Sequence, residues 1–279
     1  MGKAYQVLLQ WPSPLRRSQL CVDFSPLYDR EPHPDASLEA SIDDIWDQRR
    51  SANPSLFNAT KFRYGGYDLS PDCQQICLRL GLTDYKTFVG TNLSPKWENF
   101  LSPSTDDVLR CKRTSSPLGN GAIVETLDSL IILLQRSSNV GEYPGHLVFP
   151  GGHSEPSEIG ILGHSDHSEK LNNKIADEMF EGIVREVCEE TGIPASSLSE
   201  AELIGISRRS VNVRPTAFFF MKCRLTSSVI SEHYTRAADS FESTKLCFVN
   251  REELIDKSNE MPGCHEGGAA IFTKIDNMV

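Results

Sequence analysis

The sequence predicts an α/β protein with a larger mixed α/β unit and a smaller N-terminal α+β domain. Strand-like and helix-like segments alternate through the second half of the chain, which is typical of a mixed sheet covered by helices. Hydrophobic residues make up 39% of the 279 residues, enough for a substantial core. A stretch rich in Ser, Pro and Asp runs from residue 102 to residue 119 and is typical of a linker. We therefore divide the chain into residues 1–115 and 116–279.

The first half contains four recognisable elements. Leu38, Ile42, Ile45 and Trp46 recur at helical spacing and predict an amphipathic helix over residues 37–50. Short apolar runs predict strands, and a segment that ends in Gly-Thr-Asn predicts a short helix entering a turn. These other elements are the strands 4–10 and 76–80 and the helical segment 82–92.

Segments that predict strands and segments that predict helices alternate along the second half of the chain. Residues 179–188 predict a helix whose buried side carries Met179, Ile183, Val184 and Val187. Residues 153–176 are polar and rich in His, Ser and Asn, so we expect an exposed loop. The remaining elements are one or two strands over 121–135, a segment 143–149 leading into a glycine turn, strands 202–206, 217–223 and 246–249, and closing segments 252–257 and 269–275.

Charge and composition exclude several classes of protein. The net charge of −10, from 28 basic and 38 acidic residues, argues against a nucleic-acid partner, because such binding relies on Lys and Arg. No apolar run is long enough to cross a membrane, so we expect no membrane partner. The eight cysteines are scattered, and Cys73 and Cys77 lack a partnering pair for zinc. We expect reduced thiols in a cytoplasmic protein, and presence in the nucleus is also compatible.

The most informative feature is an acidic cluster beside a glycine turn. Glu186, Glu189 and Glu190 share one helical face, since three- and four-residue spacings bring side chains together. Such a cluster destabilises a helix unless a hard cation offsets it, and Mg²⁺ is common where phosphates bind. The alternative is a solvated acidic face. The turn Phe149-Pro150-Gly151-Gly152 upstream, Arg185 before the cluster and Gly192 after it favour a site.

Together these residues resemble the signature of the Nudix hydrolases. That signature is a glycine, five residues, a glutamate, seven residues and Arg-Glu-aliphatic-x-Glu-Glu-x-Gly-aliphatic, and 185–193 match its second half throughout. Between Gly152 and Asp177 the chain has 24 residues, and Asp177 stands where the family has Glu, with Glu178 beside it. The resemblance implies an α/β/α sandwich around a mixed sheet, so that 116–279 is the hydrolase domain. It also implies that Arg185 pairs with the early carboxylate.

The resemblance also implies a metal site and its chemistry. Mg²⁺, with Mn²⁺ as a substitute, would be held by Glu186, Glu190 and Glu189, with a further ligand from the carbonyl of Gly151 or Gly152. We take Arg185 and Glu189 as catalytic residues. The general base stays open between Glu189 and Glu242, and Glu242 is as readily interpreted as a loop residue.

Blocks outside the signature resemble the UDP-glucose/UDP-galactose diphosphatase branch of the family. They make residues 1–115 a substrate-binding domain and imply substrate contacts at Phe57, Tyr85, Arg136, His153 and Glu155. From the residues alone, Phe57 is as readily a core residue, and Arg136 is more often a surface residue. The blocks are Leu56-Phe57 with Lys61-Phe62-Arg63, Gly81 to Asn92, Pro150 to Pro156, and Glu242-Ser-Thr244.

Two further sets of residues have a simple structural explanation. Arg208, Arg209 and Arg214 flank a strand and could guide an anionic substrate, although solvation at the surface is their expected state. His164 and His167 have the spacing of a metal pair, but they lie in a polar insertion with no third ligand, so we interpret them as loop residues.

The expected activity is hydrolysis of UDP-glucose or UDP-galactose to UMP and sugar 1-phosphate. The partner would be a small-molecule nucleotide sugar, and the oligomeric state is left open. One alternative is a pyrophosphatase for ADP-ribose, coenzyme A or dinucleoside polyphosphates. Another is a nucleotide-binding module of the same fold without turnover.

Overall fold

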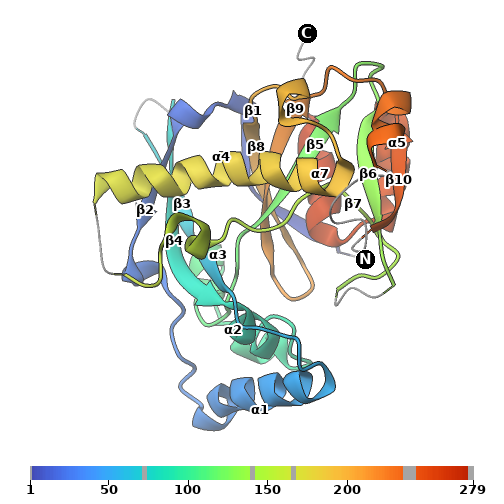
Figure 1. Ribbon diagram of the computed structural model, residues 1–279. Helices are drawn as coiled ribbons and strands as arrows, with labels where there is room; N and C mark the ends of the chain where they lie inside the picture. Colours follow the sequence, from blue (N-terminus) through green and yellow to red (C-terminus); the bar gives the residue numbers. More distant parts are fainter. Residues whose placement is uncertain (1, 71–73, 139–141, 165–167, 235–242, 276–279) are drawn as a thin grey trace.

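The computed structural model describes residues 2–70, 74–138, 142–164, 168–234 and 243–275. Two sheets organise these residues (Figure 1). A seven-stranded sheet has the order β1-β8-β9-β5-β6-β10, with β7 paired to β6, and a three-stranded sheet has the order β2-β4-β3. The strands of the two sheets are β1 Tyr5–Leu15, β2 Leu20–Phe24, β3 Thr60–Leu69, β4 Ile76–Asp84, β5 Gly119–Glu125, β6 Ile131–Arg136, β7 Leu147–Val148, β8 Glu202–Arg209, β9 Pro215–Lys222 and β10 Ser243–Val249. The helices are α1 Ala36–Ala52, α2 Tyr85–Gly90, α3 Asp107–Arg110, α4 Glu169–Thr191, α5 Ser227–Tyr234, α6 Arg251–Lys257 and α7 Gly263–Thr273.

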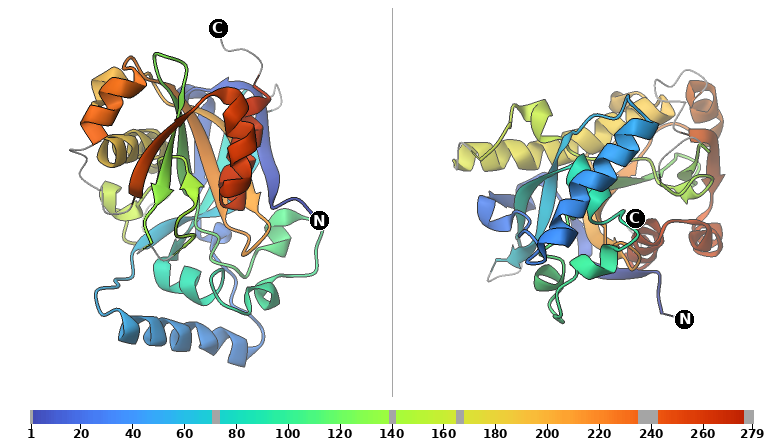
Figure 2. Two further views of the ribbon diagram at one scale, coloured as in Figure 1. Left: turned by 90° about the vertical axis from the view of Figure 1, so that its right-hand side faces the viewer. Right: turned by 90° about the horizontal axis from the view of Figure 1, so that it is seen from below.

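The larger sheet is mixed and lies between two layers of helices. β5 runs parallel to β9, whereas the other paired strands of this sheet are antiparallel. Alternate residues of β5 enter different cores, because successive side chains of a strand point to opposite faces. Ala122 and Val124 pack in the core that contains α4 and α5, and Ile123 packs in the core that contains α6 and α7. Figure 2 shows α7 against the face opposite α4. The predicted α/β/α sandwich is confirmed.

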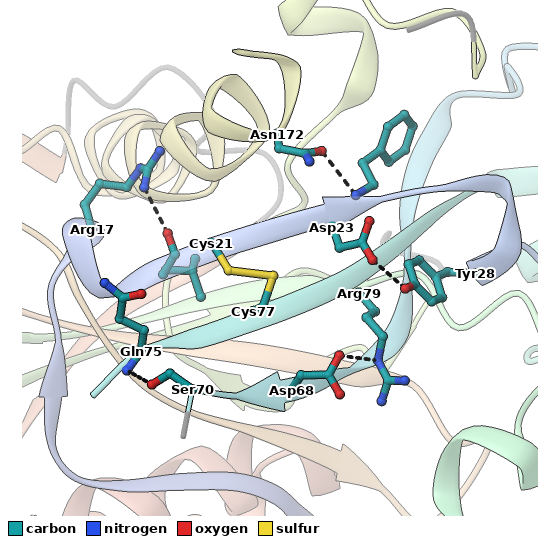
Figure 3. Close-up of a disulfide and its surroundings, with 12 residues drawn as sticks. Arg17, Cys21, Asp23, Tyr28, Asp68, Ser70, Gln75, Cys77, Arg79 and Asn172 are labelled. Carbon is teal, nitrogen blue, oxygen red and sulfur yellow. Dashed lines mark hydrogen bonds and ion pairs between the residues drawn. A yellow bond between two sulfur atoms is a disulfide. The ribbon is translucent and has the colours of Figure 1, made fainter. Parts of the chain in front are cut away.

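The smaller sheet shares its core with the larger one. Val22 of β2 and Leu78 of β4 belong to the same buried cluster as Ile175 of α4, so the small sheet packs on the first turns of that helix. Polar contacts hold the two together: the amide of Phe24 donates to Asn172 Oδ1 at 3.2 Å (Figure 3), and Arg17 pairs with Asp177. Strand β1 lies in the larger sheet next to β8. The division of the chain at residue 115 stays a prediction.

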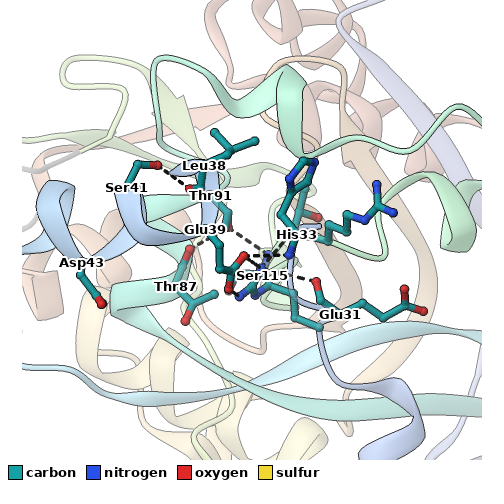
Figure 4. Close-up of polar contacts among 12 residues, drawn as sticks. Glu31, His33, Leu38, Glu39, Ser41, Asp43, Thr87, Thr91 and Ser115 are labelled. Atoms are coloured by element: carbon teal, nitrogen blue, oxygen red, sulfur yellow. Dashed lines mark hydrogen bonds and ion pairs between the residues drawn. The ribbon is translucent and has the colours of Figure 1, made fainter. Parts of the chain in front are cut away.

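Helix α1 is fixed to the segment that precedes it by one carboxylate. Glu39 of α1 accepts a hydrogen bond from the amide of His33 at 2.8 Å and forms an ion pair with Arg30 (Figure 4). Burial raises the pKa of Glu39, but the hydrogen bonds from Arg30 and His33 outweigh burial and hold it below its ordinary value. The predicted helix 37–50 agrees with α1 within two residues at each end.

The expectation of an exposed loop over residues 153–176 is wrong for its second part. Helix α4 begins at Glu169, with Ser168 as its N-cap, and Ile175 and Ala176 are buried. The segment was misread because its first turns present mainly Glu, Lys and Asn to solvent, which leaves little apolar periodicity to detect. Strands β2 and β3 and helix α5 were not predicted as elements either.

The cysteines also differ from expectation. Cys21 and Cys77 form a disulfide between β2 and β4 (Figure 3), where they are register partners with Cα atoms 4.5 Å apart. A separation of 56 residues hides this pair in the sequence, because only the parallel register brings the two residues together. The other cysteines of the described segments are free thiols. No helix in these segments is both long enough and apolar enough to cross a membrane.

Candidate active site

The site forms where the end of α4 meets the glycine turn after β7. Gly192 ends α4 in a left-handed conformation (φ 74°), as its place in the sequence predicts, and its amide donates to Cys188 O at 2.8 Å. The turn runs along β5: Ala122 N donates to Pro150 O at 2.7 Å, and Asn120 N donates to Gly152 O at 2.9 Å. Backbone hydrogen bonds therefore hold the turn against the centre of the sheet.

Two carboxylates of α4 reach the two glycines of this turn. The amide of Gly151 donates to Glu190 Oε2 at 2.7 Å. A methyl group on Gly152 would lie 2.0 Å from Glu186 Oε1, so the Glu186 carboxylate occupies the space that any other residue at 152 would fill. Gly151 has φ 155°, and a Cβ there would lie 2.2 Å from Asn120 O. Glycine at both positions is thus what brings Glu186 and Glu190 to the turn.

The early carboxylate of the signature is Glu178 rather than Asp177. Arg185 Nη2 donates to Glu178 Oε1 at 2.6 Å, and the Glu178 side chain is 4% exposed. Burial raises the pKa of Glu178, and the Arg185 guanidinium opposes this rise. Asp177, which the fixed spacing selects, pairs with Arg17 at the far side of the helix. Positions 178 and 185 are seven apart, which places them two turns apart on one face.

A polar cavity of about 370 Å³ lies over this arrangement. Glu189, the exposed third carboxylate of the cluster, and Glu186 line one side of it. Glu158 reaches it from the short helical turn Pro156–Ile159 of the insertion. The remaining lining residues are Lys61, Gly151, Gly152, His153, Glu155, Glu178, Gly182 and Arg185.

The donors at the turn fit Mg²⁺ in their chemistry. Glu186 and Glu190 offer carboxylate oxygens at adjacent glycines, and Glu189 lines the same cavity. The carbonyl of Gly151 or Gly152 offers a further oxygen, since the Gly152 carbonyl accepts from the Asn120 amide and keeps its second lone pair. Within the described ranges, no three His, Cys, Asp or Glu side chains stand close enough to enclose a metal ion. The fit therefore rests on the donor types and their common location.

A network of arginines adjoins the cavity, which corrects the expectation of solvated arginines. Arg209 is 2% exposed, and it donates to Glu142 Oε1 at 2.6 Å. Arg214 donates to Glu142 Oε2 at 3.0 Å and to His153 Nε2 at 2.9 Å. Arg136, at the end of β6, donates to the Glu142 carbonyl at 2.9 Å. Arginine is seldom buried unless it is paired, and the pairing residue here lies far away in the sequence.

Charge and burial set the protonation of this network. Burial raises the pKa of Glu142, but Arg209 and Arg214 together hold it below its ordinary value. Burial lowers the pKa of His153 well below its usual range, and the neighbouring Arg214 and Lys61 lower it further. The network thus sets the cationic Arg214 against His153, which lines the cavity.

Lys61 lines the cavity, although no role was expected for it from the sequence. It lies on β3 of the small sheet, its side chain is 12% exposed, and its ammonium forms an ion pair with Glu155 in the cavity. The pair connects the small sheet to the segment that follows the glycine turn. The alternation of aromatic and basic residues around Lys61 was the available signal, since in a strand it places every second side chain on one face.

Tyr85 and Phe57, the expected nucleotide contacts, do not line this cavity. Tyr85, at the start of α2, packs edge-on against Trp46 of α1 with ring centroids 5.9 Å apart, and burial raises its pKa. It lines a second cavity of about 700 Å³ with Arg49, Leu56 and Leu93, and it lies within electrostatic reach of Arg214 and Glu142. Phe57 is 73% exposed, so the alternative of a core residue does not hold.

Three other residues that the sequence singled out remain, namely Glu242, His167 and His164. Glu242 and His167 fall outside the described residues. His164 is a loop residue, as expected, and it attaches the insertion to the small sheet. Its ring stacks on Phe24 with centroids 4.5 Å apart, and its Nε2 lies 2.9 Å from Asp29 Oδ1.

Known proteins resemble this chain over nearly its whole length. It is 55% identical to "Nudix hydrolase 9" of Arabidopsis thaliana, over 97% of this chain and 91% of that protein. It is 35% identical to "Uridine diphosphate glucose pyrophosphatase NUDT22" of Homo sapiens, over 91% of this chain and 86% of that protein. The Bos taurus protein of the same name is also 35% identical, over 98% and 97%. No family model matches the sequence.

Solved structures are more distant. The MutT protein from Methanosarcina mazei Go1 aligns over 57% of this chain and 95% of its own, with 19% identity and a TM-score of 0.38. Tm1382, a putative Nudix hydrolase, aligns over 61% and 74%, with 18% identity and a TM-score of 0.40.

Proposed function

Because this chain belongs to the Nudix hydrolase family, we propose that it hydrolyses the diphosphate of UDP-glucose or UDP-galactose to UMP and sugar 1-phosphate with Mg²⁺. The observation that carries the proposal is the convergence of Glu186 and Glu190 on the glycine turn, beside a polar cavity that is lined by Glu186, Glu189 and Lys61. Relatives named uridine diphosphate glucose pyrophosphatase support a UDP-sugar as the substrate.

The carboxylates of α4 supply the metal site in this proposal. Held by Glu186, Glu190 and Glu189, Mg²⁺ would neutralise the diphosphate and acidify water. Glu189 is exposed in the same cavity, so its carboxylate can take a proton from the attacking water, and it is our candidate general base. Arg185 holds Glu178 and thereby keeps the face of α4 that carries the acids in place.

Cationic and hydrogen-bonding groups on the opposite wall would bind the substrate. Lys61 brings a positive charge into the cavity from β3. His153 can donate to a phosphate oxygen, and Glu155, held by Lys61, can accept from sugar hydroxyls. These groups position the diphosphate and offset its charge, and positioning together with electrostatic stabilisation supplies most of the catalysis in such reactions.

The second cavity would take the nucleoside. Tyr85 lines it and lies within electrostatic reach of Arg214 and Glu142, and Arg136, which donates to the Glu142 carbonyl, would contact a phosphate. Phe57 is exposed on the segment between α1 and β3, so its ring is available to stack on a base, and stacking contributes about 1–3 kcal/mol per base. In this arrangement the uracil would occupy the cavity lined by Tyr85, and the diphosphate would occupy the cavity lined by Glu186 and Glu189.

A substrate panel tests the proposal. The protein is incubated with Mg²⁺ or Mn²⁺ and UDP-glucose, UDP-galactose, ADP-ribose, coenzyme A or a dinucleoside polyphosphate, and the products are separated by chromatography. We expect UMP and sugar 1-phosphate from the UDP-sugars, only when the metal is present. Turnover of ADP-ribose but not of UDP-sugars would reject the substrate. Nucleotide binding without turnover of any compound would reject the enzyme in favour of a binding module.

A further inference from the structure

We infer that Arg214 is a positioning residue that fixes the imidazole of His153 with its proton on Nδ1, so that His153 meets the substrate as a hydrogen-bond donor. The inference deepens the proposed function and rests on it for the identity of the substrate. It concerns a residue pair that links the hairpin between β8 and β9 to the segment after the glycine turn.

The contact itself determines the tautomer. Arg214 Nη2 lies 2.9 Å from His153 Nε2. A guanidinium has only N–H donors and no acceptor, so the ring nitrogen that faces it must accept. A neutral imidazole carries one proton, and with Nε2 as the acceptor that proton resides on Nδ1. The ring can then donate through Nδ1–H, whereas the lone pair on Nε2 already accepts the hydrogen bond from Arg214.

Arg214 is held rigidly enough to impose this choice. Glu142 Oε2 accepts from its other terminal nitrogen at 3.0 Å, and the guanidinium lies 5.7 Å from the centroid of the Phe88 ring. These contacts approach from the loop before β7 and from α2, so the side chain is fixed on two sides. Its pairing with Glu142 also orients the plane of the guanidinium toward His153.

The backbone before Arg214 is strained in a way that fits a positioning role. Val213 has φ 48°, a left-handed conformation that β-branched residues rarely adopt. Two buried side chains hold that loop: Arg208 Nη1 donates to Val213 O and Asn92 Nδ2 donates to Asn212 O, each at 2.7 Å. Such strain persists only where the surroundings enforce it. Here its direct effect is to fix the start of β9 and the side chain that follows it.

His153 occupies the position where a fixed donor is useful. It is the first residue after Gly152, and it lines the same cavity as Glu186 and Glu189. A donor on this wall faces a region where carboxylates and a diphosphate both concentrate negative charge. The inference also assigns a negative role: His153 does not act as the general base, because its lone pair is directed at Arg214.

Spectroscopy tests the tautomer without any substrate. The protein is labelled with ¹⁵N in its histidines, and two-bond ¹H–¹⁵N correlations report which ring nitrogen is protonated. The signal of His153 is assigned by its loss in His153→Asn. We expect the Nδ1–H pattern in the native protein and a shift toward the Nε2–H pattern in Arg214→Met. Arg224→Met, which removes an exposed arginine from the same half of the chain, should leave the signal unchanged.

Two outcomes would overturn the inference: a native His153 protonated on Nε2, or a His153 signal that Arg214→Met does not move. Arg214→Met leaves Glu142 paired with Arg209, so we expect it to fold. Should it unfold, Arg214→Lys keeps the charge while losing the second donor arm, and the same shift is expected in part.

Activity measurements then connect the tautomer to the reaction. The amide of His153→Asn places a donor near the position of Nδ1, so kcat/KM for UDP-glucose should stay within about tenfold of native. The amide of His153→Gln lies nearer the position of Nε2, and a displacement of this size costs about 100-fold. Arg214→Met should add no further loss to His153→Ala, because Arg214 acts through His153. Additive losses would contradict this, whereas failure to hydrolyse UDP-sugars at all would reject the proposed substrate and leave the spectroscopic result intact.

Discussion

Arg185 donates a hydrogen bond to Glu178 across 2.6 Å, two turns away on the same face of α4. Both residues line the cavity: the Glu178 side chain is 4% exposed and the Arg185 side chain is 45% exposed. The acidic neighbour Asp177 points elsewhere, to Arg17. The pair is therefore specific to one of two adjacent carboxylates.

This pair predicts different effects for two neighbouring substitutions. Arg185→Met leaves the buried Glu178 carboxylate without its donor, which should lower the free energy of unfolding by about 1–3 kcal/mol. Asp177→Asn breaks a surface pair and should change that free energy by about 0–1 kcal/mol. Urea unfolding of both variants measures the difference. Equal losses of unfolding free energy in the two variants would show that the Arg185–Glu178 pair stabilises the fold no more than the surface pair does.

The glycine turn predicts a loss of activity without a loss of fold. In Gly152→Ala the new methyl group would lie 2.0 Å from Glu186 Oε1 and must displace that carboxylate. Because a side-chain end can move aside, the midpoint of thermal unfolding should change little, while kcat/KM should fall at least about tenfold. Gly163→Ala is the control, since a Cβ there meets nothing within 4 Å. A fully active Gly152→Ala would separate Glu186 from the reaction.

The metal site predicts the behaviour of Glu190→Gln. The amide oxygen of glutamine can still accept from Gly151 N–H, so the fold should be retained. The loss of a negative ligand should weaken Mg²⁺ binding and reduce turnover by about 100-fold or more, given that outer partners of metal ligands alone cost 10–100-fold. Titration of activity against Mg²⁺ measures both effects. Near-native rates at low Mg²⁺ would refute the assignment of Glu190 as a ligand.

Most residues in those predictions can be identified from the sequence, because their interactions join residues that are close together in the chain. The acids of α4, the Gly192 cap and the glycine turn are recognisable because each depends on the spacing of near neighbours. The arginine network was misjudged because its chemistry depends on distant partners: Arg209 and Glu142 are 67 residues apart. The same holds for Lys61 with Glu155 and for Cys21 with Cys77.

Nucleotide binding predicts a role for an exposed ring. Phe57→Ala removes a side chain that is 73% exposed in the free protein, so the stability of the fold should not change. If the ring stacks on uracil, affinity for UMP should fall by about 1–3 kcal/mol, which isothermal titration calorimetry measures. Leu27→Ala removes another exposed apolar side chain (85% exposed) that lines neither cavity, and it serves as the control. Unchanged affinity in Phe57→Ala would place the base elsewhere.

A capping carboxylate predicts a pH dependence of stability. Asp128 accepts from Thr126 and from both the amide and the hydroxyl of Ser227, and these hydrogen bonds lower its pKa to about 2. Its stabilisation is therefore complete above the unfolded value of about 3.9 and is lost as the pH falls toward 2.

The measurement is thermal unfolding of the native protein and Asp128→Asn at pH 6, 4 and 3. The gap between their midpoints should be constant from pH 6 to about 5 and should narrow by pH 3. Asp256→Asn, an exposed acid of α6, is the matched control. A difference between the two unfolding midpoints that widens on acidification would contradict the lowered pKa of Asp128.

The length of α4 matters for anyone who builds chimeras from related enzymes. At 23 residues the helix is about 34 Å long; its opening turns rest on β2 and its closing turns carry the acids of the proposed metal site. An exchange of residues 1–115 for those of a relative would remove the surface on which Ile175 is buried. A chimera that takes its N-terminal half from a relative therefore also needs the opening turns of α4 from that relative.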